Sequence, residues 1–503
     1  MESVSAHGEA YRAGETGAAP GPGGLDLSAL AECVSLQFLR ESSILPLSFG
    51  PDQLTVAMAP PIDDSLVEAL VLSTGRRVTV QKADRGRIMA QMMQLFSDHP
   101  AETGPAEGDE DVERLKDLAS EAPVVRLVSH LIEEAVRQGA SDIHVEPFPD
   151  RLAVRFRVDG VLRDLPSPPL SFARAAVSRI KILANLNIAE RRLPQDGRVS
   201  QLVLGHALDL RVSIMPTVHG ESAVIRLLDH SAGVRQLSSL GLRSDEEEVL
   251  SQLMHTPNGM ILVTGPTGSG KTTTLYTALS LIDAGSRKVL TIEDPVEYHM
   301  ARVNQVQVRP QIGLTFAAIL RSLMRQDPDV IMVGEMRDAE TADIAVHASL
   351  TGHLVLSTLH TNSAAGAITR LIDMGVEPFL LTSTLRLVIG QRLVRTLCPH
   401  CKKPRPATPD EQRLFEPVPV IALYHAAGCD SCGGTGFKGR LGLFELMRMD
   451  TALRDLTLER AGSDRIEAAA REAGMRSLWE DGLDKVCRGL TTLEEVRRVV
   501  ELS

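Results

Sequence analysis

The residues best suited to bind a phosphate chain lie at 265–272, where the sequence reads GPTGSGKT. This stretch follows an apolar run at 260–263 and precedes a helix-compatible segment at 273–282. Glycines at this spacing turn successive backbone N–H groups inward, and the helix start adds the positive end of its dipole. We therefore predict a nucleoside-triphosphate site in which Lys271 reaches the β- and γ-phosphates and the Thr272 hydroxyl ligates Mg²⁺. The predicted nucleotide-binding residues are Gly265, Pro266, Thr267, Gly268, Ser269, Gly270, Lys271, Thr272 and Thr273.

Polar side chains follow further apolar runs of the same region. The runs MILVTG, VLTIED, DVIMVGE and LVLSTLH alternate with helical segments, which predicts a parallel sheet with ligands at the carboxyl ends of its strands. The polar residues at those ends are Glu293, Asp294, Glu297, Glu335 and His360. We expect Glu335 to polarise an attacking water, Glu297 and Glu293 to orient Mg²⁺ through its waters, and His360 to contact the γ-phosphate. A carboxylate at a strand end can also be a helix cap, but four such ends in one P-loop domain favour catalysis for Glu335 and Glu297.

Four cysteines carry a second chemical signal. Cys398 and Cys401 form one C-x2-C pair, and Cys429 and Cys432 form another. Four thiolates at this spacing close a tetrahedral Zn²⁺ site without an open position, so we predict a structural zinc; His400 could compete as a ligand. The alternatives are a redox pair and a nucleic-acid zinc ribbon. The remaining two cysteines are expected to be packed core thiols: Cys33 and Cys487.

The composition narrows the classes of function. The chain has 503 residues, a formal net charge of -12 and 3% aromatic residues. Nucleic-acid motors usually carry a basic face or aromatic stacking platforms, so we expect no nucleic acid as partner. No apolar run approaches 18 residues, and the first residues lack the basic and apolar regions of a secretory signal. We expect a cytoplasmic protein whose association with a membrane comes through a partner.

Changes in composition and periodicity predict a multidomain α/β protein. Alternation in the run LAVRFRV places Arg155 and Arg157 on one face of a strand, and Arg211 and Arg226 lie on two further predicted strands. Such arginines are often solvated or salt-bridged. The C-terminal helices read as a lid or a subunit contact. The predicted segments are a disordered tail at 1–24, a small α+β domain at 25–97, an acidic linker at 98–121, an α+β domain at 122–232, a short linker at 233–240, the P-loop domain at 241–397, the tetracysteine insert at 398–445 and helices at 446–503.

Five stretches together resemble one family, the ATPases of bacterial type II secretion, within the wider group that also powers type IV pilus extension and retraction. The resemblance runs from about residue 25 to the C-terminus. Among them, GPTGSGKTT resembles the family's Walker A loop and TIEDPVE resembles its aspartate box. The stretch at 327–362 resembles its Walker B strand and histidine box. The five are ASDIHVEPF at 140–148, RLPQDGRVS at 192–200, GPTGSGKTT at 265–273, TIEDPVE at 291–297, and 327–362, which runs from DPDVIMVGEMRD to TGHLVLSTLHTN.

The resemblance implies a role for individual residues. Glu335 is implied as the catalytic carboxylate, Glu297 as part of the aspartate box and His360 as the histidine-box residue. Arg211 and Arg226 match the family's arginines that reach the γ-phosphate from the preceding domain. The tetracysteine insert is similar to that of secretion and pilus-assembly members. One departure is Ser222, where family members usually carry a basic residue, which puts a phosphate or interface contact from this position in doubt.

The resemblance also implies an architecture and partners. It implies a RecA-like fold at 241–397, a PAS-like fold at 122–232 and a partner-docking domain at 25–97. It implies a homo-hexameric ATPase that uses ATP, Mg²⁺ and Zn²⁺ to drive pseudopilus assembly and protein export across the outer membrane. The 25–97 domain would dock on the cytoplasmic domain of an inner-membrane secretion protein, and an inner-membrane platform protein would be a further partner.

Three alternatives remain open from the sequence. A type IV pilus extension ATPase would use the same chemistry with a different partner. A zinc-ribbon nucleic-acid motor would need a basic, aromatic channel. A nucleotide-gated scaffold would bind ATP and hardly hydrolyse it, but an intact Glu335 argues against that class.

Overall fold

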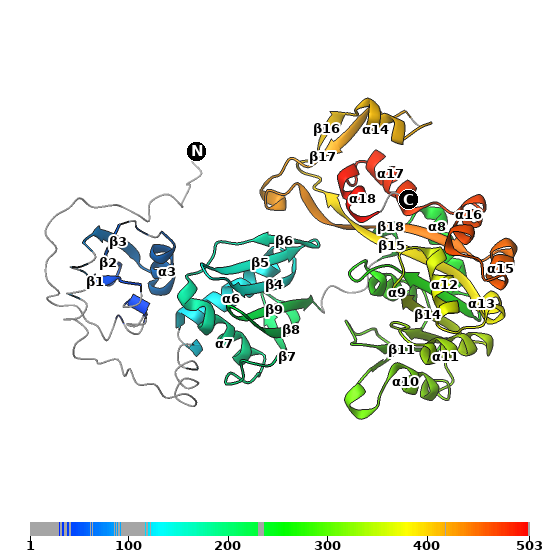
Figure 1. Cartoon of the computed structure of the whole chain (residues 1–503), viewed down its shortest axis with the longest axis horizontal. Coiled ribbons are helices and arrows are strands. Elements are labelled where there is room, and N and C mark those ends of the chain that lie inside the picture. The colour runs from blue at the N-terminus through cyan, green and yellow to red at the C-terminus, as the bar shows by residue number, and fades with distance from the viewer. Residues whose placement is uncertain are drawn as a thin grey trace. The chain divides into compact units, whose positions relative to one another are not determined.

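The computed structural model describes residues 42–84 except 61 and 63, residues 122–229, residues 236–500 except 418, and scattered residues between 30 and 120. Several predictions lie outside the described residues: the tail at 1–24, most of the linker at 98–121, and both ends of the small α+β domain predicted at 25–97. The chain divides into two compact units, Met1–Ser231 and Ala232–Ser503, which are described in turn (Figure 1).

The N-terminal unit begins with a three-stranded sheet in the order β1-β2-β3. β1 and β2 are antiparallel, whereas β2 and β3 are parallel because a helix connects them. Apolar residues of the sheet and the helix form a small core, against which Cys33 is partly buried. The elements are β1 (Leu45–Phe49), β2 (Gln53–Met58), α3 (Asp64–Thr74) and β3 (Arg77–Lys82).

The same unit contains a six-stranded antiparallel sheet in the order β6-β5-β4-β9-β8-β7. Apolar residues at helical spacing in α6 pack with α7 against one face of this sheet and form a single core. The helix ends two residues before Gly139, whose φ of +65° suits a helix terminus. The elements are α6 (Ala122–Arg137), β4 (Ala140–Pro147), β5 (Leu152–Val158), β6 (Val161–Asp164), η1 (Leu170–Phe172), α7 (Ala173–Leu183), β7 (Gln195–Val203), β8 (His206–Thr217) and β9 (Gly220–Asp229).

The second unit is built on a seven-stranded sheet in the order β12-β11-β13-β14-β10-β15-β18. The first six strands run parallel, as predicted for this region, and β18 pairs antiparallel with β15. β10, β13 and β14 are buried along their whole length because helices cover both faces of the sheet. The strands are β10 (Gly259–Thr264), β11 (Val289–Glu293), β12 (Asn304–Gln307), β13 (Val330–Val333), β14 (Leu354–Leu359), β15 (Leu385–Leu397) and β18 (Phe437–Arg448).

Two hydrophobic cores lie on the two faces of this sheet. Met260 and Leu262 of β10 belong to the core with α10 to α13, and Ile261 and Val263 belong to the core with α8 and α9. Side-chain N-caps fix the starts of three helices, as their Thr, Asp and Ser residues favour. The helices are η3 (Leu237–Ser239), α8 (Ser244–Met254), α9 (Lys271–Leu279), η4 (Pro310–Ile312), α10 (Phe316–Leu323), α11 (Ala339–Leu350), α12 (Ala364–Asp373) and α13 (Pro378–Thr384).

The region between β15 and β18 shares a core with the C-terminal helices. Ala407, Phe415 and Leu423 pack with side chains of α17 and α18, so the tetracysteine region does not depend on a core of its own. β18 runs across the predicted boundary at residue 445 because its residues pair with β15 as far as Arg448. The remaining elements are β16 (Lys403–Pro406), α14 (Pro409–Leu414), β17 (Ala422–His425), η5 (Asp430–Cys432), α15 (Thr451–Leu458), α16 (Ser463–Glu472), α17 (Leu478–Cys487) and α18 (Leu493–Val499).

One cysteine prediction was wrong. Cys487 is the last residue of α17 and is exposed, because the buried positions of this helix fall on other residues of the helical repeat.

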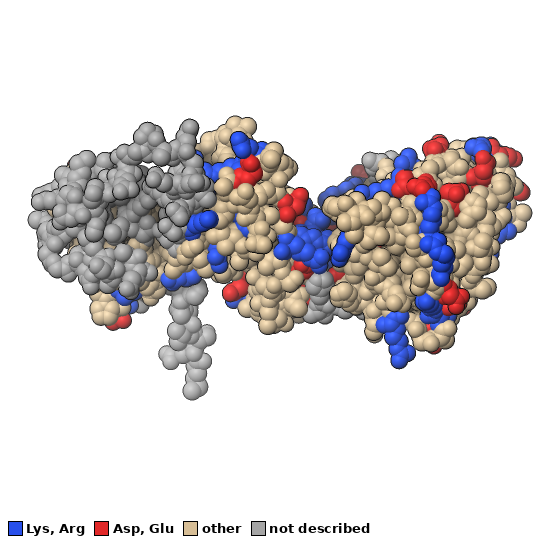
Figure 2. Space-filling view, turned by 90° about the horizontal axis from the view of Figure 1, so that it is seen from below, with Lys and Arg blue, Asp and Glu red and all other residues tan. Residues whose placement is uncertain are grey.

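The surface of the second unit is mixed in charge. On the face of the second unit seen in Figure 2, lysine and arginine side chains lie among acidic and uncharged ones. Within the described residues, no helix combines the length and the apolar character needed to cross a membrane.

Candidate functional site

The loop between β10 and α9 has the backbone geometry of a phosphate cradle. Gly265 has a φ of +151°, and a Cβ placed there would lie 2.4 Å from the carbonyl oxygen of Gln391. Gly270 has a φ of +89° and is the N-cap of α9. Both positions therefore require glycine, and the loop delivers its backbone to the N-terminus of a helix, where anions bind favourably.

Lys271 and Ser269 are the buried polar side chains of this loop. The Lys271 Nζ donates to the carbonyl oxygens of Gly265 at 2.7 Å and Pro266 at 3.0 Å. Burial lowers the pKa of Lys271 to about 8, although the nearby charge of Glu335 acts in the opposite direction. The Ser269 Oγ is buried and has no hydrogen-bond partner among the described residues. An unpaired hydroxyl beside a buried ammonium fits a bound phosphate chain.

Thr272 fits the predicted magnesium position. It occupies the first turn of α9, directly after Lys271, and its side chain is exposed. A hydroxyl at this point can ligate a hard cation that also binds phosphate oxygens. The residues at the mouth of the cradle, Pro266 to Gly268, are exposed as well.

Glu335 and His360 lie close together because they follow neighbouring strands at one edge of the sheet. Glu335 follows β13, and His360 follows the neighbouring strand β14. The His360 Nε2 lies 3.5 Å from Glu335 Oε2. Arg337, which sequence reasoning missed, places its Nε 2.7 Å from the same oxygen, and this bond raises the pKa of Arg337. Its signal was its place two residues after Glu335 in GEMRD.

The aspartate-box carboxylates behave differently from each other. Glu293 is only 3% exposed and accepts hydrogen bonds from Tyr276 Oη, from Thr291 Oγ1 at 2.5 Å and from Gln305 Nε2 at 3.1 Å. It therefore faces the interior, and the expectation that it orients Mg²⁺ does not fit this arrangement. Burial and the Glu293 carboxylate raise the pKa of Tyr276. The backbone N–H of Glu297 donates to the Tyr276 hydroxyl at 3.3 Å, so this tyrosine connects the two glutamates.

Two residues of β15, Gln391 and Arg392, also interact with the cradle and α9, and neither was predicted from the sequence. Gln391 is 2% exposed, and its Oε1 accepts from the Thr274 hydroxyl of α9 at 2.8 Å. Arg392 follows it and lowers the pKa of Lys271 through its charge. The available signal was the apolar run LRLVIGQRLV, which predicts a buried strand but does not show which strand it pairs with.

The predicted arginines of the N-terminal unit lie side by side. Arg211 of β8 and Arg226 of β9 are cross-strand partners in the six-stranded sheet. The Arg226 Nε is 3.0 Å from the Asp142 carboxylate, and the Arg211 Nε is 3.9 Å from that of Asp209. The Arg226 side chain is 59% exposed, so its ion pair leaves the guanidinium accessible to solvent. The Ser222 hydroxyl donates to the carbonyl oxygen of Met215 at 3.3 Å.

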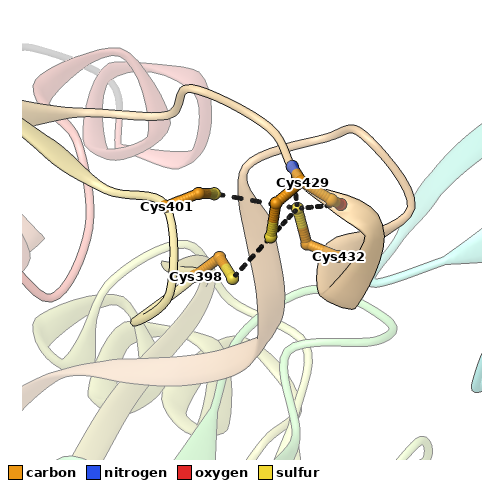
Figure 3. A group of neighbouring side chains, drawn as sticks. All are labelled: Cys398, Cys401, Cys429 and Cys432. Carbon is orange, nitrogen blue, oxygen red and sulfur yellow. Dashed lines mark hydrogen bonds between the residues drawn. The ribbon is translucent and has the colours of Figure 1, made fainter. Parts of the chain in front are cut away.

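The four predicted zinc ligands converge (Figure 3). Their sulfur atoms all lie within 4.8 Å of one another, and the pairs that hydrogen-bond are 3.7 to 3.9 Å apart. A tetrahedral zinc about 2.3 Å from each thiolate separates the sulfurs by about 3.8 Å, so the cluster fits this ion. His400 is exposed and lies outside the cluster.

The backbone around Cys432 favours the ionised form of its thiol. Burial alone would raise the pKa of its thiol, but the backbone N–H groups of Cys429 and Gly436 donate to its sulfur at 3.2 and 3.1 Å. Together with the neighbouring thiols they lower the pKa of Cys432 to about 6. Thiolates are the form that binds metal, so the backbone of this turn favours the ligand state.

Comparison with known proteins finds two matching sequence families. The family described as "Type II/IV secretion system protein" matches residues 117–498, and the MshEN domain matches residues 22–102. "Type II secretion system protein E" of Xanthomonas campestris pv. campestris is 50% identical over 481 residues, covering 93% of this chain and 85% of that protein. "Type II secretion system ATPase E" of Vibrio cholerae serotype O1 is 51% identical over 394 residues, covering 78% of each.

Solved structures show the same fold. The pilus retraction motor PilT with bound ADP is 28% identical, with a TM-score of 0.50, covering 74% of this chain and 97% of that one. The ATPase DotB of Legionella pneumophila is 23% identical, with a TM-score of 0.54, covering 73% of this chain and 94% of that one. The second likeness shows the fold alone.

Proposed function

The chain belongs to the type II/IV secretion system protein family and is an ATP-hydrolysing secretion ATPase, and from that premise we propose that it is the hexameric motor of pseudopilus assembly in type II secretion. The observation that carries the proposal is the grouping of Glu335, His360 and Lys271 at the carboxyl edge of a parallel sheet. These groups are the parts that phosphoryl transfer to water requires.

Each residue has one task in the proposed hydrolysis. The cradle's backbone N–H groups and Lys271 bind the β- and γ-phosphates. Glu335 accepts a proton from the attacking water. His360, which lies 3.5 Å from the Glu335 carboxylate, contacts the γ-phosphate. Thr272, with Glu297 acting through waters, would hold Mg²⁺. Bound Mg²⁺ neutralises charge that develops on the transferred group.

Arg211 and Arg226 complete the site when the ring assembles. Their guanidinium groups stabilise the charge on the γ-phosphate, a contribution worth about 10³–10⁵ in rate for an arginine finger. Their position as cross-strand neighbours, with Arg226 paired to Asp142 at 3.0 Å and Arg211 3.9 Å from Asp209, supports a joint role. Hydrolysis is thereby coupled to movement of the domain at 122–232, and that movement drives assembly.

The proposed partners follow from the domains. The domain at 25–97, where the MshEN match lies, docks on the cytoplasmic domain of an inner-membrane secretion protein. An inner-membrane platform protein receives the motion. The protein therefore works in the cytoplasm and is recruited to the inner membrane through partners. The tetracysteine cluster binds one structural Zn²⁺.

Secretion in the host bacterium tests this function. A strain lacking the gene is supplied with the wild-type chain or with Glu335→Gln at equal abundance, and secreted enzymes are measured in the medium and in the periplasm. We expect the wild-type chain alone to restore export, with exported proteins accumulating in the periplasm otherwise. Export restored by Glu335→Gln, or loss of surface pili with unchanged secretion, would contradict the proposal.

A further inference from the structure

The segment from His360 to the start of α12 is fixed by hydrogen bonds from three strands. The first comes from β10, which leads into the phosphate cradle. The backbone N–H of Thr361 donates to Thr264 Oγ1 at 3.0 Å, and the two threonine hydroxyl oxygens are 2.6 Å apart. The residue next to His360 is therefore tied to the last residue before Gly265.

The second attachment comes from Arg392 of β15. Its Nη2 donates to the carbonyl oxygen of Asn362 at 2.8 Å, and its Nη1 donates to the carbonyl oxygen of Gln391 at 3.1 Å. The guanidinium thus connects the histidine-box loop with the strand that lies against the cradle. Asn362 has only one residue between it and His360, so a shift of this carbonyl moves the imidazole.

The third attachment comes from Glu445 of β18. Its Oε1 accepts a hydrogen bond from the backbone N–H of Ala364, the first residue of α12, at 2.6 Å. Glu445 is 4% exposed, and a Cβ on its cross-strand partner Gly390 would lie 2.4 Å from Oε1. A carboxylate at a helix N-terminus is favourable, and no other residue than glycine leaves it room.

These two side chains hold the loop from both ends. Arg392 binds its carbonyl side and Glu445 binds its N–H side. Burial raises the pKa of Glu445, while the Ala364 N–H and the positive charge of Arg392 act in the opposite direction. The strands of Arg392 and Glu445 form one hairpin, and the segment that connects them begins with Cys398 directly after β15 and includes Cys432 shortly before β18. The hairpin is therefore a continuous connection between the tetracysteine cluster and the histidine-box loop.

We infer that Arg392 and Glu445 are positioning residues for ATP hydrolysis, which hold the 361–364 loop so that His360 stays against Glu335. The inference rests on the proposed roles of these two catalytic residues. Neither Arg392 nor Glu445 binds the cradle's phosphate positions in this account. Their loss therefore lowers the rate of the chemical step and leaves nucleotide affinity nearly intact.

Four variants of the full-length chain test the inference: Arg392→Gln, Glu445→Met, Glu445→Gln and, as control, Arg448→Gln on an exposed position of the same hairpin. Misplacement of a catalytic group by about 1 Å costs roughly 10²-fold in rate. We expect Arg392→Gln and Glu445→Met to lower kcat by about 10- to 100-fold and to change the Kd for a fluorescent ATP analogue less than threefold. Glu445→Gln keeps an oxygen that accepts from Ala364 and should retain most of the activity.

Hydrogen exchange of the amides of Thr361 and Ala364 provides a readout that does not depend on turnover. Arg392→Gln and Glu445→Met should speed their exchange at least tenfold, while exchange in β10 and the melting temperature stay near wild type. Unchanged exchange in both variants or unchanged kcat in both would overturn the inference. It would also be overturned if Kd rose while kcat and the melting temperature fell in parallel. If the Glu335→Gln variant hydrolysed ATP at the wild-type rate, the proposed function would be refuted. The exchange measurement would still decide whether Arg392 and Glu445 position the loop.

Discussion

Lys271 is the residue whose protonation should be visible in nucleotide binding. Because burial lowers its pKa to about 8, the free protein loses this positive charge as pH rises through 8 and keeps it below. The phosphate chain binds the charged form, so binding above pH 8 must take up a proton. We expect the ATP affinity to fall by about tenfold for each pH unit above 8 and to stay level between pH 6 and 7.5.

Calorimetry in buffers of different ionisation enthalpy checks this prediction. Proton uptake should appear at pH 8.5 and vanish near pH 6.5. Glu335→Gln is an informative comparison, since Glu335 raises the pKa of Lys271, and its removal should move the fall in affinity to lower pH. Affinity that is flat from pH 7 to pH 10 would show that Lys271 keeps an ordinary pKa.

The Tyr276 hydroxyl donates to buried Glu293 and accepts from the backbone N–H of Glu297. Tyr276→Phe should therefore affect both the stability of the fold and kcat. The variant removes a donor to buried Glu293 and the acceptor of the Glu297 backbone N–H. Thr291→Val removes a donor to Glu293 alone. We expect each variant to lower the free energy of unfolding by about 1–3 kcal/mol, measured by urea denaturation, because a hydrogen bond to a buried carboxyl group is lost.

Only Tyr276→Phe should also lower kcat, because only this change frees the backbone of the aspartate box. Equal kcat in the two variants would mean that Glu297 does not depend on Tyr276 for its position. Such a result would limit the role of Tyr276 to the stability of the buried carboxylate.

At the level of elements, the tetracysteine cluster lies in the segment that connects β15 to β18, and apolar residues of that segment pack on α17 and α18. We expect purified chain to contain one zinc per chain by mass spectrometry. Cys432→Ser should lose the metal and lower the melting temperature, because structural zinc contributes directly to folding. Cys487→Ser is a matched control, since this exposed cysteine lies outside the cluster. A metal-free wild-type chain of full stability would contradict the zinc assignment.

The elements that sequence could predict are those whose chemistry is contiguous. The β10–loop–α9 segment and the two C-x2-C pairs carry their signals within a few residues, so the cradle and the cysteine cluster were predictable. The pairing of β15 with β10 joins residues more than 120 positions apart, and no local pattern encodes it. Gln391 and Arg392 were missed for that reason.

Side-chain direction was the other limit. The strand end at Glu293 predicted a carboxylate near the metal, but Tyr276 from α9 and Gln305 from β12 turn it inward. Arg337 was hidden in an exposed turn, where arginines are usually solvated. Cys487 was predicted to be buried because cysteines usually are, but its position on α17 faces solvent.

At the scale of the whole molecule, the proposed function requires the two units to act on one nucleotide. The cradle, Glu335 and His360 belong to the second unit, whereas Arg211 and Arg226 belong to the first. If ring assembly brings the arginines to the γ-phosphate, specific activity must rise with protein concentration. Arg211→Ala and Arg226→Ala should then lower kcat by up to about 10³-fold with nucleotide affinity retained, and Arg155→Ala on the same sheet should not.

The most direct measurement is ATP turnover by the purified chain as a function of its concentration, with Glu335→Gln as the comparison. The account predicts that turnover per chain rises with concentration and that Glu335→Gln lowers it at least about 10²-fold while ATP still binds. Turnover that is strictly proportional to concentration and unaffected by Glu335→Gln would contradict both the catalytic role of Glu335 and the assembled motor.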